Sequence, residues 1–66
     1  MDLTVNGDAA RVEDGTTVAD LVAARAEDHR RVAVAVNADV VPRSAWADTP
    51  LRDGDAVEVL VAVAGG

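Results

Sequence analysis

The feature that most constrains this chain is an alternation near its end, where every second residue from Val57 to Val63 is valine. A period of two is typical of a β-strand with one apolar face, because successive side chains of a strand point to opposite sides. The preceding Asp53-Gly54 predicts a tight turn, since glycine adopts positive φ without steric cost. We therefore expect a buried central strand that ends three residues before Gly66.

Shorter alternations earlier in the chain predict four more strands, and apolar residues at helical spacing predict one helix. Asn6-Gly7 indicates a hairpin turn between the first two strands. Thr17 is expected to cap the helix, with Asp20 three residues later in the position of a capping box. In chain order, the expected elements are strands at 2–5 and 10–13, a helix at 18–27, and strands at 32–36, 40–41 and 57–63.

This order of elements predicts an α+β protein with a β-grasp (ubiquitin-like) fold, in which a single helix packs on one face of one mixed sheet. The handedness of crossover connections predicts that the first and last strands are parallel neighbours at the sheet centre. We expect residues 1–63 to form one domain and residues 64–66 to form a flexible tail. The segment from Arg43 to Pro50 is expected to be irregular, with Trp46 covering one end of the core.

The composition narrows the classes of function. In a chain of 66 residues whose only aromatic is Trp46, the core has no room for a cofactor pocket of about 300 Å³ or more. The net charge of −6 disfavours nucleic acid as a partner, because phosphates repel it. The absence of cysteine excludes a disulfide framework and a side-chain persulfide. We expect a soluble, cytoplasmic protein that is monomeric when free, with no membrane segment, no cofactor and no catalytic activity.

The side chains offer no constellation for nucleophilic catalysis or metal binding. Ser44 and His29 are the only serine and histidine, and His29 lies in a charged segment where a solvated role is expected. Asp53-Gly54-Asp55 is the best metal candidate, but the pattern is more typical of a turn. By elimination, the group with distinctive chemical reactivity is the Gly66 carboxylate. With Gly65 before it, this end can enter a channel too narrow for any Cβ, although a frayed terminus is the ordinary alternative.

The same alternation predicts which strand residues face away from the helix. If Leu3, Val5, Val34 and the four valines from 57 to 63 meet the helix, the opposite face shows Thr4, Ala33, Ala35, Leu60 and Ala62. This open face is flat, weakly apolar and made of small residues. It is either an ordinary half-exposed sheet surface or a docking face for a partner, with Leu60 as its most obvious anchor.

A set of motifs covers nearly the whole chain. They are Val5-Asn6-Gly7, the helix start at 14–21, Val32 to Asn37, Val41-Pro42-Arg43-Ser44 with Trp46, the segment 51–59, and Gly65-Gly66. Together they resemble the ThiS family, the ubiquitin-like sulfur carriers of thiamin biosynthesis. The chain departs from the family pattern at Ala38-Asp39, where Gly-Glu is common, and at Ala64, where a third glycine often precedes the pair.

The resemblance implies that an ATP-dependent adenylating enzyme (ThiF-like) converts the Gly66 carboxylate to an acyl-adenylate. A persulfide sulfur donor would then displace AMP and leave a C-terminal thiocarboxylate. A thiazole synthase (ThiG-like) would take the sulfur for thiazole formation. In this scheme Ala64 and Gly65 belong to the tail that presents Gly66, and the chain is a substrate with no catalysis of its own.

Three alternatives stay open at this stage. A sulfur carrier of another pathway, serving molybdopterin, cysteine or tRNA thiolation, would share the fold and the tail, and only the internal motifs favour thiamin. A TGS-like regulatory or RNA-binding module has a similar helix start, but the negative charge and the Gly-Gly end speak against it. A ubiquitin-like protein modifier would show itself as conjugates to lysine.

Overall fold

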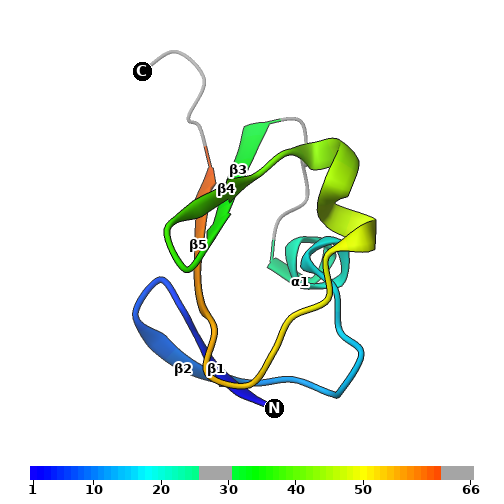
Figure 1. Ribbon diagram of the computed structural model, residues 1–66. Coiled ribbons are helices and arrows are strands. Elements are labelled where there is room, and N and C mark those ends of the chain that lie inside the picture. Colours follow the sequence, from blue (N-terminus) through cyan, green and yellow to red (C-terminus); the bar gives the residue numbers. More distant parts are fainter. Residues whose placement is uncertain (26–30, 62–66) are drawn as a thin grey trace.

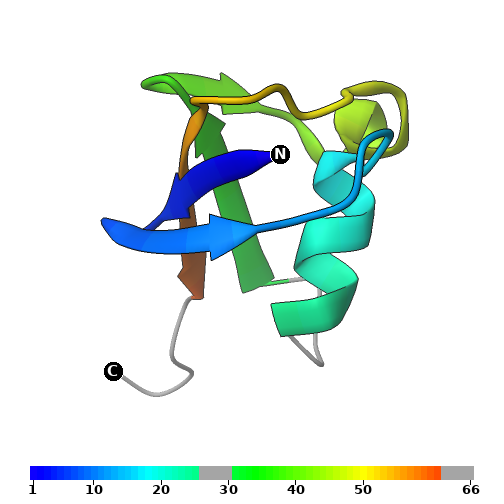
Figure 2. The same cartoon turned by 90° about the horizontal axis from the view of Figure 1, so that it is seen from below.

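A five-stranded mixed sheet and an α-helix across one of its faces make up the fold (Figures 1 and 2). The computed structural model describes residues 1–25 and 31–61. Its elements are β1 (Asp2–Val5), β2 (Asp8–Arg11), α1 (Val18–Arg25), β3 (Val32–Val36), β4 (Asp39–Val41), the 3-10 helix η2 (Arg43–Asp48) and β5 (Ala56–Val61). The strands lie in the order β2-β1-β5-β3-β4. The predicted α+β, β-grasp arrangement is confirmed.

The last strand, β5, is the centre of the sheet and has a neighbour on each side. On one side β1 runs parallel to it, with Val5 opposite Val57. On the other side β3 runs antiparallel to it along its whole length, from Val32 opposite Val61 to Val36 opposite Val57. The predicted parallel pairing of the first and last strands is therefore confirmed. The hairpins β1–β2 and β3–β4 are held together by β5, which lies between them.

The first hairpin turns in two residues, which moves β2 away from its predicted position. Asn6 and Gly7 have φ angles of 53° and 84°, the left-handed values that a type I′ hairpin turn requires. Asp8 therefore pairs directly with Val5, and β2 covers Asp8–Arg11 instead of residues 10–13. The predicted boundary was wrong because it allowed a longer loop than this tight turn needs.

The second hairpin is equally tight. Asn37 and Ala38 have φ angles of 51° and 72°, so they also form a two-residue turn in the left-handed region. Val36 pairs directly with Asp39 across this turn. As a result, β4 begins one residue before the predicted start at Val40.

Trp46, the only aromatic residue of the chain, is buried at one end of the core, as predicted. It lies on η2 (Arg43–Asp48), so the segment predicted to be irregular is largely a 3-10 helix. The indole Nε1 donates a hydrogen bond of 2.9 Å to the backbone oxygen of Val41, which ties η2 to β4. The Arg43 guanidinium lies over the indole ring, 5.9 Å from its centroid, at cation–π distance.

The helix α1 begins at a capping box, as predicted. The hydroxyl oxygen of Thr17 accepts a hydrogen bond of 3.2 Å from the backbone nitrogen of Asp20, and an Asp20 carboxylate oxygen accepts one of 3.0 Å from the backbone nitrogen of Thr17. Three apolar residues of the helix are buried: Val18, Leu21 and Val22. The rest of the predicted helix, with Ala26 and Glu27, lies outside the described residues.

The core lies between α1 and one face of the sheet. In the described part of the chain it consists of Leu3, Val5, Val18, Leu21, Val22, Val34, Trp46, Leu51, Val57 and Val59. Val61 was predicted for this core but is 56% exposed. It is paired with Val32 at the end of β5. α1 runs in the same direction as β5 (Figure 2), and its buried residues Val18, Leu21 and Val22 lie near its start. On β5, burial is confined to Val57 and Val59.

Two asparagine side chains extend the sheet where backbone pairing stops. Asn6 Oδ1 accepts a hydrogen bond of 2.8 Å from the backbone nitrogen of Val59, and its Nδ2 donates one of 3.1 Å to the Val59 oxygen. On the other side of β5, Asn37 Oδ1 accepts a hydrogen bond of 3.0 Å from the backbone nitrogen of Ala56. Its Nδ2 donates a hydrogen bond of 3.0 Å to Oδ1 of Asp55. Each side-chain amide thus makes the hydrogen bonds to β5 that a backbone peptide group of a longer neighbouring strand would make.

Replacement of Asn6 is expected to destabilise the fold although the residue is exposed. Asn6→Ala removes two hydrogen bonds worth about 1 kcal/mol each and adds about 1 kcal/mol of backbone strain at positive φ. We expect the free energy of unfolding to fall by about 2–3 kcal/mol, measured by urea denaturation with Trp46 fluorescence. Asn6→Gly is the matched control, because it loses the same bonds without the strain and should lose about 1 kcal/mol less. Losses below about 0.5 kcal/mol in both variants would contradict this role for Asn6.

Candidate functional site

The predicted reacting group, the Gly66 carboxylate, comes after β5 in the chain. The contacts that hold β5 in the sheet therefore fix the point from which the chain continues toward this group. Besides the end of the predicted helix, the residues singled out from the sequence that lie outside the described part of the chain are His29, Ala62, Val63, Ala64, Gly65 and Gly66. Near the end of β5, the Asn6 amide holds Val59 on one side, and β3 pairs with the strand up to Val61 on the other. The predicted tail is therefore attached to a strand that is fixed on both sides.

The open face of the sheet, opposite α1, carries the other predicted docking residues: Thr4, Ala33, Ala35 and Leu60. Ala33 lies opposite Leu60 across β3 and β5. The Leu60 side chain is 64% exposed, which is unusual for a leucine in a central strand. Ala33 is also exposed, whereas Thr4 and Ala35 are half-buried. The structure thus places these four residues on one face, and their docking role stays a prediction.

A small hollow on the open face brings some of these residues together and leaves one out. Ala33, Ala35 and Leu60 line it, and its volume is about 70 Å³. The other lining residues are Val34, Val40 and Glu58. Thr4 lies on β1, on the other side of β5, and does not line the hollow.

Val40 is the apolar residue of this face that the sequence analysis missed. Its side chain is 77% exposed, more than that of Leu60. The tight turn pairs Val36 with Asp39, so Val40 lies opposite Ala35 and shares its side of the sheet. The signal was present in the sequence, because a two-residue turn after Val36 determines the register of β4 and hence the face of each residue.

The other candidate for a binding site, Asp53-Gly54-Asp55, is a turn. Gly54 has a φ of 86°, and the backbone nitrogen of Asp55 donates a hydrogen bond of 3.1 Å to the Arg52 oxygen. Both carboxylates bond within the fold, Asp55 with the Arg52 backbone nitrogen at 2.8 Å and Asp53 with that of Asp2 at 2.7 Å. Across residues 1–25 and 31–61, no three histidine, cysteine or acidic residues are grouped to hold a metal ion. The turn reading of this motif is confirmed.

No helix in the described ranges has the length and apolar character needed to span a membrane. The functional geometry that the structure does show is a β-grasp sheet with an exposed, weakly apolar face. This face includes residues at the end of the central strand, β5. After β5 the chain continues in sequence to Gly65-Gly66. These features define the class of small ubiquitin-like (β-grasp) proteins.

The family within this class is shown by sequence. The chain matches the model of the ThiS family over residues 3–66, and it belongs to that family. It is 32% identical over 66 residues to the sulfur carrier protein ThiS of Escherichia coli strain K12, with 100% of both chains covered. It is also 35% identical to a thiazole synthase of Paramagnetospirillum magneticum, of which it spans 20%.

Solved structures agree with this assignment. The crystal structure of the thiamine biosynthesis protein ThiS from Geobacter metallireducens matches with a TM-score of 0.84 and 38% identity, covering 100% of both chains. An NMR structure of a thiamine biosynthesis protein from the same organism matches with a TM-score of 0.81, covering 100% of this chain and 88% of that one. The resemblance to ThiS inferred from the motifs is confirmed, and with it the class of sulfur carrier in thiamine biosynthesis.

Proposed function

We propose that this chain carries sulfur as a thiocarboxylate on Gly66 and delivers it for formation of the thiazole of thiamine. The observation that carries the proposal is the family match, which runs over residues 3–66 and so includes the Gly-Gly end. The full-length similarity to a sulfur carrier protein supports the same role. A chain end without side chains suits delivery into a narrow channel, because only glycine leaves the backbone unshielded.

The chemistry requires activation, because a carboxylate is a poor electrophile. An ATP-dependent adenylating enzyme would join the Gly66 carboxylate to AMP with loss of pyrophosphate. The terminal sulfur of a persulfide donor would then attack the acyl carbon and displace AMP, and a thiol would cleave the sulfur–sulfur bond to leave the thiocarboxylate. Two easier substitutions replace one difficult one, which is the advantage of covalent activation. The chain would act as substrate in each step.

Docking through the open face would make these steps efficient. Binding energy gained on Leu60 and its neighbours is remote from the reacting atom, and it can be used to position the tail. β5 connects the two regions, since it carries Leu60 and precedes Gly66 in the chain. We propose that Thr4, Ala33, Ala35, Leu60 and Ala62 contribute to this contact.

The proposed partner that accepts the sulfur is a thiazole synthase. Its support is the relative from Paramagnetospirillum magneticum, a thiazole synthase one fifth of which resembles this whole chain. A carrier-like segment and a synthase thus occur in one polypeptide there. The adenylating enzyme and the persulfide donor rest on the family chemistry, and all these partners would meet the chain in the cytoplasm.

Changes at the chain end are expected to abolish sulfur loading without unfolding the protein. Deletion of Gly66, or addition of one residue after it, moves the carboxylate away from the position where adenylation occurs. We expect no sulfur-for-oxygen mass gain by intact mass spectrometry after incubation with adenylating enzyme, ATP and a persulfide donor. Ala64→Gly is the control, since it keeps the length and should load at least as well as wild type. Undiminished loading of either altered end would refute the role of Gly66.

A charge at Leu60 is expected to weaken partner binding. Leu60→Glu places a carboxylate in the centre of the open face, and we expect binding to the adenylating enzyme to weaken by about 1–3 kcal/mol. Isothermal titration calorimetry measures the difference. Ala24→Glu is the matched control, because Ala24 is exposed on α1, on the other side of the sheet. Equal affinities for wild type and Leu60→Glu would show that Leu60 is not an anchor.

A further inference from the structure

One acidic residue, Glu58, lies among the apolar residues that line the hollow of the open face. Glu58 follows the same alternation as Leu60, so it points away from the helix, and it lies opposite Ala35 on β3. It also lines the hollow of about 70 Å³ and is its only ionisable lining residue. Every other residue around this hollow is alanine, valine or leucine. The hollow therefore combines an apolar floor with one carboxylate.

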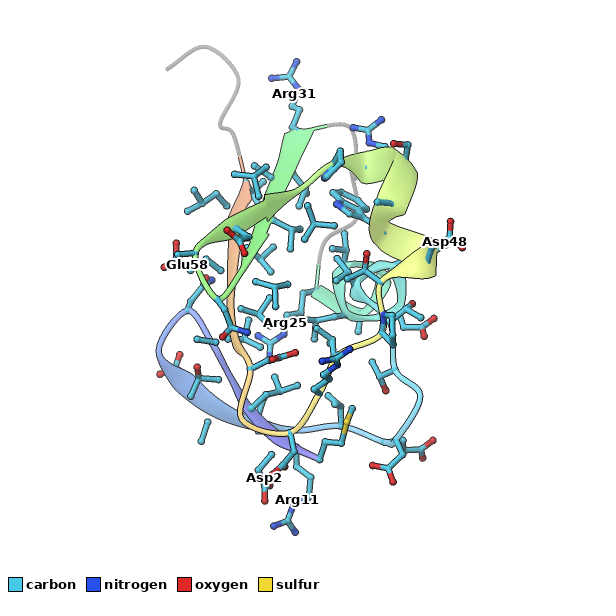
Figure 3. The ribbon with its side chains drawn as sticks, in the orientation of Figure 1. Asp2, Arg11, Arg25, Arg31, Asp48 and Glu58 are labelled. Atoms are coloured by element: carbon cyan, nitrogen blue, oxygen red, sulfur yellow. The ribbon has the colours of Figure 1, made fainter. Side chains whose placement is uncertain are left out.

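Within the described residues, no ion pair uses the Glu58 carboxylate. The ion pair on the open face joins Arg11 to Asp2 at 2.9 Å, at the far end of the β1–β2 hairpin. Figure 3 shows this pair well away from Glu58. The residues opposite Glu58 and Leu60 on β3 are both alanine, so they offer no charge. Glu58 thus presents its negative charge to solvent on the face where a partner is proposed to dock.

The size of the hollow and its chemistry restrict what can occupy it. A volume of about 70 Å³ is far below the roughly 300 Å³ of a small-molecule site. It holds several water-sized groups, which is the scale of one side chain. A docking partner that covered Glu58 with apolar atoms would bury an unpaired charge at a large cost. A side chain that is apolar along its length and cationic at its end matches both the apolar floor and the carboxylate.

We propose that the hollow receives one arginine or lysine side chain of the thiazole synthase, with its aliphatic stem on Ala33, Ala35 and Val40 and its charge on Glu58. These two side chains bury their stems on apolar surface while the charged end reaches a polar partner. The inference rests on the proposed function, since it assumes that the open face docks the synthase. Beyond that function, the inference identifies Glu58 as the residue that determines which surface of the partner can bind the open face. The net charge of −6 would favour approach of the same basic surface.

Charge reversal at Glu58 tests this proposal. Binding of Glu58→Lys, Glu58→Gln and wild type to the thiazole synthase is measured by titration at low and high salt. We expect Glu58→Lys to raise Kd at least about tenfold and Glu58→Gln to raise it by less, because neutralisation removes the attraction without adding repulsion. Glu13→Lys is the matched control, since it makes the same charge change in the exposed connection between β2 and α1 and should leave Kd within about twofold.

The outcomes separate this inference from the proposed function. Sulfur loading of Gly66 on wild type, read by intact mass, tests the function alone. If wild type loads and binds the synthase but Glu58→Lys binds equally well, the role of Glu58 is overturned and the function stands. Tighter binding by Glu58→Gln would also overturn it, because it would mean that the carboxylate is covered without a cation. A loss in Glu13→Lys equal to that in Glu58→Lys would reduce the effect to net charge and contradict a specific pair.

Discussion

The structure depends on one central strand whose neighbours are too short to pair with all of it. β1 turns away after Val5, and β3 ends at Val36, so backbone groups at both ends of β5 need other partners. Asn6 and Asn37 supply them with side-chain amides, which carry the same donor and acceptor as a peptide group. Both residues also make the hairpin turns, at φ values that asparagine tolerates. The same two residues thus form the hairpin turns and complete the hydrogen bonding of β5.

On β3, the two faces of the sheet differ in side-chain size. Toward α1, valine and leucine fill the core, while on the open face β3 carries alanine at 33 and 35. Because alanine is small, the larger Leu60, Val40 and Glu58 stand around a depression instead of a flat surface. A larger residue at either alanine would fill it. The surface shape is therefore a consequence of binary patterning with two sizes of apolar residue, and it needs no special loop.

The predictable part of the structure was the part determined by local pattern. The valine alternation, the Thr17–Asp20 capping box and the Asn6-Gly7 turn each depend on neighbours in sequence, and each was found as expected. The prediction that Val61 lies in the core was wrong, because alternation shows the side of a strand on which a residue lies but not how far the helix reaches along that strand. The Asn6 bonds to Val59 join residues far apart in the chain, and no local signal announces such contacts.

For the candidate site, the sequence identified the open face but not its shape. Leu60, Ala33 and Ala35 followed from alternation, whereas the hollow required the register between β3, β4 and β5. Val40 was placed on this face only by that register, whereas Glu58 follows the same alternation as Leu60 and needed the register only to be placed at the hollow. Elimination singled out the Gly66 carboxylate, and its proposed chemistry came from the family resemblance of the motifs, which the family match over residues 3–66 supports.

The position of β5 also has a consequence for how the protein is made. The sheet's central strand is the last strand in sequence, so the hairpins β1–β2 and β3–β4 have nothing to join them until residues 56–61 are available. Isolated two-stranded hairpins are marginal in water. A ribosome that has synthesised only the first 55 residues therefore holds a chain without a complete core. The closing step of folding is then a pairing between segments more than 50 residues apart in the chain.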